Sequence, residues 1–342
     1  MLPAAPLRWA IVGPGRIAQR FAQAVCGLPG AQLVALCARD TGRAQVFAAQ
    51  WAAANAAPLK VHSSLGELLA NPDVDAVYVA TPHAFHADAI AACLMAGKPV
   101  LCEKPLVPSV AIAKPLIALA QTRQVFLMEA LWSRFLPVYA QVAGWLKEQQ
   151  IGPVRAVQSS FCFSVPFAAE SRLFNPALAG GALLDIGIYN LSLTRWVLQQ
   201  AWGACAEPEA VHVHGVLAPT GVDQRVAATF EWPGGTTAQF VCGFDLQADN
   251  GLRICGERGF IDIPGGFWQA TTARLCQKGQ DPVVVDAPFA INGFEGQIAE
   301  AARCIRAGLF ESPVMPHAET LATLAWLDML RQRLGVRYPF EG

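Results

Sequence analysis

Apolar runs alternate with helix-like stretches through the first third of the chain. The apolar runs cover residues 7–12, 31–38, 74–80, 100–102 and 125–128, and the helix-like stretches cover residues 16–26, 42–54, 85–95 and 109–121. Short buried strands alternating with helices are typical of a parallel sheet covered on both faces. This part of the chain therefore predicts an α/β domain with a doubly wound parallel sheet of the Rossmann type.

The remaining two thirds follow another pattern. A helix is expected over residues 138–149, a long strand over 154–165 and a helix over 181–199. Strand-like runs then follow at 211–217, 225–232, 236–244, 252–256 and 260–263, and two helices close the chain at 295–307 and 317–334. Turn residues separate the strands, which indicates an α+β domain with a large, mostly antiparallel open sheet. We expect the boundary near residues 126–129, giving a dinucleotide-binding domain over 1–126 and a substrate-binding and oligomerisation domain over 127–342.

Composition narrows the class of protein. Of the 342 residues, 54% are hydrophobic and 15% are charged, so a large core is expected. The net charge is −1, and no basic run appears, which argues against a nucleic-acid partner. The apolar part of the N-terminal segment is too short to span a membrane, so we expect neither a signal peptide nor a membrane partner. The ten cysteines form no C-x-x-C pair, which favours reduced thiols in a cytoplasmic protein.

A glycine-rich turn directly follows the first apolar run. Gly13, Gly15 and Ala18 form the pattern G-x-G-x-x-A, and Arg16 and Ile17 open the following helix. The first glycine permits a tight turn, the second lets a pyrophosphate approach the backbone, and the small third residue allows close packing of helix on strand. The N–H groups at the start of the helix are available to phosphate oxygens. The pattern predicts dinucleotide binding.

The end of the second strand selects the dinucleotide. NAD-selective sites place an acidic residue there, on the ribose 2′-hydroxyl. Here Arg39 occupies the tip and Arg43 follows one helical turn later, and a guanidinium is suited to a 2′-phosphate and to stacking on adenine. This favours NADP, while Asp40 keeps NAD open as an alternative.

Two later strand ends carry candidate reactive residues. Thr81 and His83 follow one strand, and Glu103 and Lys104 end the next. Ligands of doubly wound sheets collect at the carboxyl ends of the strands, so we expect these side chains near the nicotinamide half of the cofactor. His86 either packs at the cofactor pocket or caps local backbone. The histidines offer no third ligand for a metal, and none is predicted.

The second domain supplies the other candidates. Asp185 and Tyr189 are four residues apart, so on an α-helix they share one face. A nearby cation such as Lys104 favours a phenolate and lowers the pKa of a tyrosine, which would make a proton-transfer group. Read alone, the pair fits the polar edge of an amphipathic helix better than a reactive site.

Other positions have two interpretations each. Trp132 and Arg134 follow the strand at 125–128 and either wall the substrate pocket or begin the core of the second domain. Arg172 and Asn175 precede the double glycine and either bind substrate hydroxyls or anchor a loop. Phe163, in the long strand-like run, is placed with the substrate pocket.

The ordered motifs resemble one family. G-P-G-x-I-A, A-T-P-H-x-x-H, E-K-P and a later D-x-x-x-Y are similar to the Gfo/Idh/MocA oxidoreductases. M-E-A-L-W-S-R-F-L-P, A-G-G-A-L-L-D-I-G-I-Y, E-S-P-V-M-P-H-A-E-T and G-V-R-Y-P-F-E resemble its dimeric dihydrodiol dehydrogenase and NADP-dependent D-xylose dehydrogenase branch. The resemblance spans nearly the whole chain. Relatives often carry asparagine where this chain has His83, and many carry histidine where it has Tyr189.

The resemblance implies an NADP(H)-dependent oxidoreductase. Lys104 and Tyr189 would be the catalytic pair, with Asp185 positioning substrate or supporting proton transfer, and hydride would pass between the nicotinamide and a carbinol carbon of a sugar or cyclic diol. A homodimer or higher oligomer through the second domain's sheet is also implied. Alternatives are a reductase of a dicarbonyl sugar and a non-catalytic NADP-binding regulator. The expected cofactor contacts are Gly13, Gly15, Arg16, Ile17, Arg39, Arg43, Thr81, His83, His86, Glu103, Lys104, Trp132 and Arg134, and the expected substrate contacts are Lys104, Trp132, Phe163, Arg172, Asn175, Asp185 and Tyr189.

Overall fold

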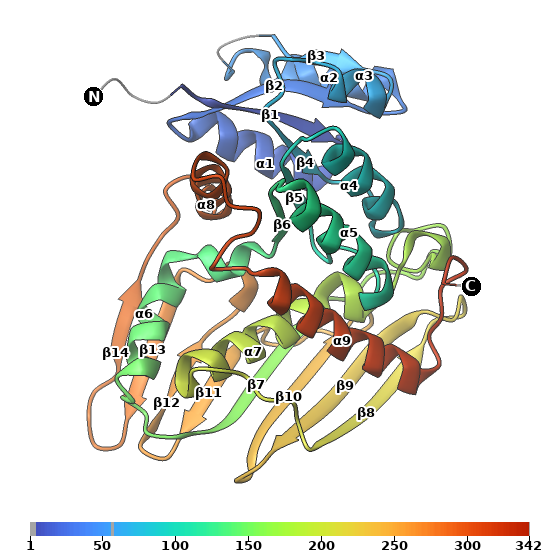
Figure 1. The fold of residues 1–342 in the computed structure, drawn as a ribbon. Helices are drawn as coiled ribbons and strands as arrows, with labels where there is room; N and C mark the ends of the chain where they lie inside the picture. Colours follow the sequence, from blue (N-terminus) through green and yellow to red (C-terminus); the bar gives the residue numbers. More distant parts are fainter. Residues whose placement is uncertain (1–4, 56–57, 342) are drawn as a thin grey trace. The chain divides into compact units, whose positions relative to one another are not determined.

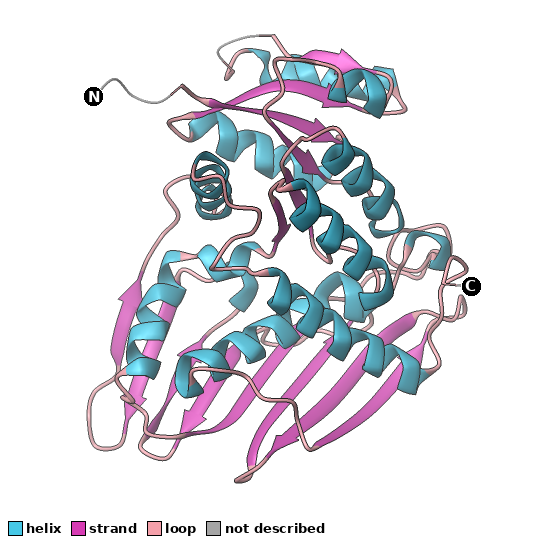
Figure 2. Cartoon of the chain, in the orientation of Figure 1, coloured by secondary structure: helices cyan, strands magenta, loops and turns pink. Residues whose placement is uncertain are grey.

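The computed structural model describes residues 5–55 and 58–341. The chain divides into two compact units, of which the first comprises residues 1–132 and 290–321 and the second residues 133–289 and 322–342. Each unit has its own sheet (Figures 1 and 2).

The first unit alternates strands and helices as expected. Its strands are β1 (Leu7–Val12), β2 (Ala31–Cys37), β3 (Lys60–His62), β4 (Ala76–Val79), β5 (Val100–Glu103) and β6 (Leu127–Ala130). Its helices are α1 (Arg16–Gly27), α2 (Thr41–Ala52), α3 (Leu65–Leu69), α4 (His86–Met95), α5 (Val110–Arg123) and α8 (Glu295–Arg306), with a 3₁₀ turn η1 at His83–Phe85.

All six strands of this unit run parallel in the order β3-β2-β1-β4-β5-β6. The strand order reverses beside β1, where doubly wound sheets bind their ligands. Trp9, Phe21 and Tyr78 are fully buried between β1, α1 and β4, and the rings of Phe21 and Tyr78 stack with centroids 3.8 Å apart. The sheet confirms the expected Rossmann architecture.

The unit boundary differs from the expected division at residue 126. Strand β6 completes the parallel sheet, and residues 290–321 return to the first unit. Hydrogen bonds hold residues 290–321 on the first unit. Arg20 donates to the Asn292 carbonyl at 2.6 Å, and the N–H of Leu127 donates to the Phe310 carbonyl at 3.0 Å. The first of the two closing helices, α8, therefore belongs to the nucleotide-binding unit and packs on α1.

The second unit contains one large sheet. Its strands are β7 (Val154–Cys162), β8 (Ala210–Leu217), β9 (Asp223–Trp232), β10 (Thr236–Gly243), β11 (Leu252–Gly256), β12 (Gly259–Ile263), β13 (Thr272–Gln277) and β14 (Val283–Asp286). Its α-helices are α6 (Pro137–Lys147), α7 (Ile188–Trp202) and most of α9 (His317–Leu334). It also contains the short 3₁₀ turns η3 (Pro176–Leu178) and η5 (Phe267–Gln269) and the π-helical turn η4 (Leu183–Gly187). The 3₁₀ turn η2 (Trp132–Phe135) spans the division between the units.

The eight strands lie in the order β14-β13-β12-β11-β7-β10-β9-β8, and every pairing is antiparallel except that of β10 with β7. Helices α6, α7 and α9 cover one face of this sheet (Figure 1). Apolar side chains alternate toward the helices, for example Val226, Ala228 and Phe230 on β9. The large, mostly antiparallel sheet is as expected.

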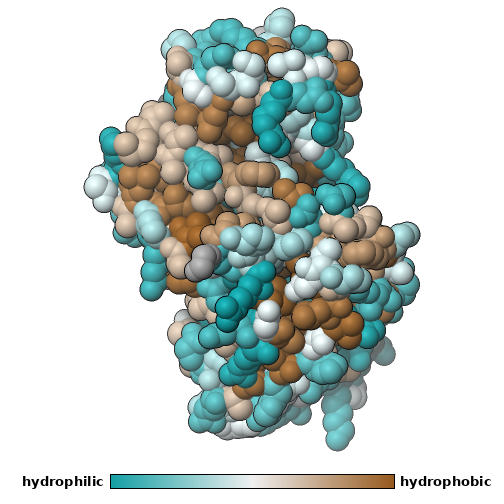
Figure 3. Space-filling view, turned by 90° about the vertical axis from the view of Figure 1, so that its right-hand side faces the viewer, coloured by the Kyte–Doolittle hydropathy of each residue, from teal (hydrophilic) through white to brown (hydrophobic). Residues whose placement is uncertain are grey.

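The surface shows no single apolar region on the face drawn in Figure 3, where hydrophobic patches are broken up by hydrophilic ones.

By length and composition alone, one helical stretch, Pro176–Trp202, is apolar enough to cross a membrane. However, 89% of its most apolar window is buried, as in a core helix of a soluble protein. Burial against the sheet accounts for its hydropathy.

Candidate active site

The glycine turn after β1 has the geometry of a phosphate-binding loop. Gly13 has φ +95°, and a Cβ added there would lie 2.9 Å from the carbonyl oxygen of Ala80. Gly15 is the N-cap residue of α1, and no side chain caps the helix. The backbone N–H groups that open α1, at Arg16 and Ile17, are thus left to a ligand, and an anion is the ligand that such a helix end attracts.

The tip of β2 presents arginine. Arg39 is exposed, and its guanidinium carbon lies 5.5 Å from the centre of the Phe85 ring. Asp40 is the N-cap of α2, where its carboxylate accepts the backbone N–H of Arg43 at 3.0 Å. One oxygen of the acidic side chain that kept NAD open is therefore engaged by the helix, and the exposed charged side chains at this tip are those of Arg39, Asp40 and Arg43.

The segment after β4 holds an unpartnered polar atom. The Thr81 hydroxyl oxygen is buried and has no hydrogen-bond partner within residues 5–55 and 58–341. His83 is half-buried, and its ring centre lies 5.8 Å from that of His86. The glycine cradle, the uncapped helix end and this hydroxyl together fit a bound dinucleotide.

His86 holds backbone in place. Its side chain is fully buried, with Nε2 2.8 Å from the Thr81 carbonyl and Nδ1 3.0 Å from the Pro105 carbonyl. Burial lowers the pKa of His86, and the Lys104 charge acts in the same direction. Of the two interpretations of His86, the structure shows the contacts to local backbone, and that His86 also touches the cofactor stays a prediction.

The loop that carries Lys104 is held from three sides. Besides His86, the Glu129 carboxylate accepts the Leu106 N–H at 2.9 Å and the Thr320 hydroxyl at 2.8 Å. Glu103 is buried and accepts the Tyr78 hydroxyl. Glu103 was expected among the cofactor contacts, and what the structure shows is a carboxylate directed into the core. Lys104 itself is half-buried at the end of β5.

In the second unit, Asp185 lies in a π-helical turn. The Ile188 N–H reaches back five residues to the Leu183 carbonyl, and the regular helix α7 begins only at Ile188. The α-helical spacing by which we expected Asp185 and Tyr189 to share a face does not describe this turn, because an i→i+5 bond widens it. Such π-turns occur frequently at functional sites.

The two candidate reactive side chains have distinct surroundings. The Asp185 carboxylate is buried and accepts a hydrogen bond from Arg172, from Nη1 to Oδ1 at 2.8 Å. Tyr189 is 6% exposed, and its ring centre lies 5.7 Å from that of Phe161. Arg172, which is largely exposed, therefore presents its guanidinium beside the Asp185 carboxylate.

The remaining expected contacts pack within their own units. Trp132 is buried in the first unit, where its ring contacts Phe294 and the guanidinium of Arg20. Arg134 is buried in the second unit and donates from Nε to the Ser192 hydroxyl at 3.1 Å. Arg134 thus lies in the core of the second unit, as its second interpretation had it, whereas Trp132 packs in the core of the first. That either touches cofactor or substrate stays a prediction.

Asn175 and Phe163 border the same region of the second unit. Asn175 accepts the Ala177 N–H at 2.9 Å and so caps a local turn, which is the loop-anchor interpretation. Phe163 lies against the rings of Phe161 and Phe244. An aromatic cluster therefore adjoins Tyr189 through Phe161, which stacks on Trp268 at 3.4 Å between ring centres.

Sequence reasoning missed several residues that hold the site. Glu129 and Phe85 lie within quoted motifs, but nothing in those motifs signals their contacts. Asp223, which bonds the π-turn, and Tyr338, which bonds Gly180, come from strand and tail segments distant in sequence. No local pattern could have found these two. Among the described residues, no group of three His, Cys, Asp or Glu side chains could hold a metal ion.

A Rossmann unit with a nucleotide cradle, joined to an α+β unit carrying buried polar groups, defines a dinucleotide-dependent oxidoreductase. Residues 7–131 match the sequence model described as an oxidoreductase family with an NAD-binding Rossmann fold, and residues 139–262 match that of the Gfo/Idh/MocA C-terminal domain. The chain belongs to the Gfo/Idh/MocA oxidoreductase family and is a dehydrogenase of that family.

Curated relatives cover the whole length. The chain is 36% identical over 342 residues to a trans-1,2-dihydrobenzene-1,2-diol dehydrogenase of Xenopus laevis, spanning 97% of this chain and 99% of the relative. It is 34% identical over 345 residues to the enzyme of that name from Homo sapiens, spanning 97% and 98%. The resemblance to the dihydrodiol dehydrogenase branch is thus confirmed.

Solved structures share both units. An aldose-aldose oxidoreductase from Caulobacter crescentus, complexed with glycerol, aligns with a TM-score of 0.83 and 26% identity over 96% of this chain and 98% of that one. KijD10, a 3-ketoreductase from Actinomadura kijaniata solved with NADP and TDP-benzene, aligns with a TM-score of 0.81 and 26% identity over 96% and 97%.

Proposed function

We propose that this protein is an NADP(H)-dependent oxidoreductase that transfers hydride between the nicotinamide and a carbinol or carbonyl carbon of a sugar or cyclic diol. The substrates would be of the trans-dihydrodiol or aldopyranose type. The observations that carry the proposal lie in each unit: the exposed Arg39 at the tip of β2 in the first, and buried Asp185 and Tyr189 in the second.

NADP is favoured by the groups at the tip of β2. Asp40 caps α2 by accepting the Arg43 N–H through Oδ1, so part of its carboxylate is engaged by the helix. Arg39 is exposed and lies over the Phe85 ring, as a guanidinium that pairs a 2′-phosphate and stacks on adenine would. A related 3-ketoreductase was crystallised with NADP, which supports the same choice.

Proton transfer falls to Tyr189 in this proposal. When bound, NADP⁺ would supply the hydride acceptor. The Tyr189 phenolate would take the substrate hydroxyl proton, and the Lys104 ammonium would favour that phenolate and the developing alkoxide. Asp185, paired with Arg172, would orient the hydroxyl groups of the substrate.

The aromatic cluster supports the substrate class. Phe161 stacks on Trp268 and lies against Tyr189, so a broad aromatic surface adjoins the phenol. Cyclic diols and sugar rings combine apolar C–H faces with hydroxyl groups, and such faces pack well on aromatic rings. The names of the curated relatives and of the aldose-aldose oxidoreductase point to the same two classes.

Two alternatives use the same site. A reductase of a dicarbonyl sugar would run the same proton and hydride transfers in reverse, with Tyr189 as the acid. A non-catalytic NADP-binding regulator would keep the nucleotide site and show no turnover.

The test is a substrate screen. Purified protein is incubated with aldoses, ketoses and trans-dihydrodiols, with NADP⁺ and with NAD⁺, and the absorbance of the reduced cofactor is followed. We expect turnover with at least one diol or aldose and a preference for NADP⁺. NADPH binding without turnover in either direction would favour the regulator, and activity only on carbonyl substrates would favour the reductase.

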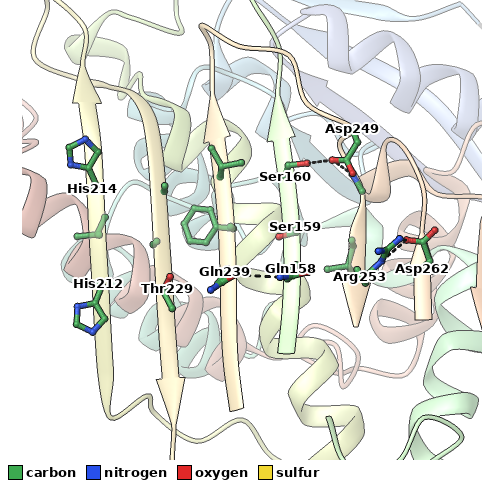
Figure 4. Close-up of a pocket in the computed structure, with 17 residues that line it drawn as sticks. Gln158, Ser159, Ser160, His212, His214, Thr229, Gln239, Asp249, Arg253 and Asp262 are labelled. Atoms are coloured by element: carbon green, nitrogen blue, oxygen red, sulfur yellow. Dashed lines mark hydrogen bonds and ion pairs between the residues drawn. The ribbon is translucent and has the colours of Figure 1, made fainter. Parts of the chain in front are cut away.

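We also propose that two copies associate through the open face of the second unit's sheet. Figure 4 shows this face, which is hollowed by about 650 Å³ across β7 to β12. Gln158 donates to Gln239 at 3.4 Å near its centre, and Thr229 and Val241 lie beside them, so the centre carries no charge. An uncharged centre with paired charges at the side, such as Arg253 with Asp262, suits a self-complementary interface.

Light scattering after size-exclusion chromatography tests this proposal. Gln239→Arg places a charge at the centre of the face and should convert the assembly to monomers. Gln141→Arg, an exposed position on α6, is the matched control and should leave the mass unchanged. A wild-type monomer, or a Gln239→Arg variant with unchanged mass, would contradict the proposal.

A cytoplasmic location is proposed on the thiols. All ten cysteines are free thiols, and six of them are buried. A reducing compartment maintains such thiols.

A further inference from the structure

Beneath the double glycine that precedes the π-turn lies a buried carboxylate. Asp223, the first residue of β9, is 0% exposed. Its Oδ2 accepts the backbone N–H of Leu183, the first residue of the π-turn, at 2.6 Å. Its Oδ1 has no hydrogen-bond partner in the part of the chain that the structure describes. The carboxylate thus lies directly at the start of the segment that carries Asp185.

The backbone around this carboxylate leaves no spare room. Gly181 has φ +122°, and a Cβ at this position would lie 2.3 Å from Asp223 Oδ1. A Cβ at Gly180 would lie 2.8 Å from the Leu173 carbonyl oxygen. The two glycines are therefore required because the turn passes between Asp223 and the loop before it.

The C-terminal tail closes the same turn from another direction. The Tyr338 hydroxyl donates to the Gly180 carbonyl at 2.6 Å. Tyr338 lies under the buried guanidinium of Arg331, which is itself bonded to Glu341 and Asp328. Strand β9 and the tail thus bond this segment at two positions, Leu183 and Gly180.

We propose that Asp223 is a positioning residue, which through the Leu183 N–H fixes the π-turn and so sets where Asp185 and Tyr189 stand. The inference rests on the proposed function, because it takes those two side chains as the groups that meet substrate. Tyr338 assists through Gly180. A carboxylate at the start of a helical segment is also favoured by the positive end of the segment.

The charge on Asp223 gives the arrangement a pH dependence. Burial raises the pKa of Asp223 to about 7, while the N–H groups of Leu183 and Ala182 and the Arg331 charge lower it in part. The other titratable groups that face it are the Tyr338 phenol and the Cys242 thiol, and burial raises the pKa of both well above the usual values. The carboxylate therefore ionises near neutral pH, and its bond to Leu183 strengthens as it does.

Kinetics of three variants test the proposal. Asp223→Ala removes the acceptor and should lower kcat about tenfold or more at saturating substrate, with KM for NADP⁺ unchanged. Asp223→Asn keeps an acceptor and should retain more of kcat, but should lose the part of the kcat–pH profile that changes near pH 7. Asp281→Ala, an exposed aspartate between β13 and β14, is the control and should match wild type.

A second measurement does not depend on turnover. Hydrogen exchange followed by mass spectrometry should be faster over residues 181–190 in Asp223→Ala and, more weakly, in Tyr338→Phe, with exchange in the first unit unchanged. Should Asp223→Ala fail to fold, the Asp223→Asn profile and the Tyr338→Phe exchange decide. A wild-type kcat–pH profile in Asp223→Asn, or wild-type exchange over 181–190 in Asp223→Ala or Tyr338→Phe, would overturn the proposal.

Tyr189→Phe, assayed in parallel, separates this inference from the proposed function. If Tyr189→Phe keeps normal turnover, the proposed proton transfer is wrong. If Tyr189→Phe loses turnover and Asp223→Ala does not, only the positioning role is wrong.

Discussion

Replacing Arg39 by alanine tests how the protein selects its cofactor. Arg39 is exposed at the tip of β2 and lies over Phe85, while Asp40 is held by α2. If the guanidinium pairs the 2′-phosphate, Arg39→Ala removes a contact that NADP makes and NAD lacks. NADP binding should therefore weaken, and NAD binding should not.

The size of the effect follows from the contact and its exposure. A hydrogen bond to a charged group contributes about 1.5–3 kcal/mol, and each 1.4 kcal/mol is roughly tenfold in affinity. Arg39 is exposed to solvent, and Arg43 remains as a second cation in the first turn of α2. We therefore expect an effect at the lower end of this energy range, which corresponds to a rise of about tenfold in the dissociation constant of NADPH.

Fluorescence titration with NADPH and NADH measures this without a substrate, and steady-state KM values for NADP⁺ and NAD⁺ follow once one is known. Arg39→Lys is informative, because it keeps the charge but loses the planar group, and it should fall between wild type and Arg39→Ala. Arg123→Ala, an exposed arginine at the end of α5, is the matched control. An equal loss of affinity for both cofactors would refute the assignment of Arg39 to the 2′-phosphate.

Three further variants address the reaction and the stability. Tyr189→Phe keeps the ring against Phe161 but removes the hydroxyl, so kcat should fall about 10²–10⁴-fold while NADPH titration stays normal; near-normal turnover would move the acid–base role to Asp185. Lys104→Met should lower kcat at saturating cofactor and shift the pH–rate profile, because the cation would support the phenolate; a change confined to cofactor affinity would assign Lys104 to the ribose alone. Asp223, whose pKa is raised to about 7, stabilises the fold below its unfolded pKa near 4, and this contribution is lost as pH rises through 7. The free energy of unfolding of Asp223→Asn, measured by denaturation at several pH values, should therefore vary less between about pH 4 and 7 than that of wild type. The same change with pH in both proteins would contradict this.

Local chemistry was enough to identify the nucleotide site from the sequence. The roles of Gly13, Gly15 and the start of α1 depend on residues that are neighbours in the chain, so the motif carries its own geometry. The alternation of buried strands and helices predicted the parallel sheet for the same reason. The strand-like runs separated by turn residues predicted the second, mostly antiparallel sheet, and the likeness of the ordered motifs to one family implied the roles of Lys104, Asp185 and Tyr189.

Short edge elements and contacts across the chain escaped sequence reasoning. Strand β3 has three residues, and β14 is exposed along most of its length, so neither shows an alternating pattern. The π-turn at Leu183–Gly187 lies inside a mostly apolar stretch, whose pattern predicts a helix but not the number of residues per turn. The return of residues 290–321 to the first unit depends on bonds such as those between Arg20 and Asn292, whose partners lie 272 residues apart.

The division has one physical cause. The sequence by itself determined the glycine turn, the alternation of strands and helices, and which strands end in candidate reactive side chains. These features depend on residues that are close together in the chain. The His86 contact to Pro105 and the Asp223 bond to Leu183 join residues 19 and 40 positions apart, so they form only when folding brings those segments together. For His86 and Asp223, burial then sets the proton affinity, because the cost of removing a charge from water appears only when the surrounding core has closed around it. Only the tertiary structure could decide these.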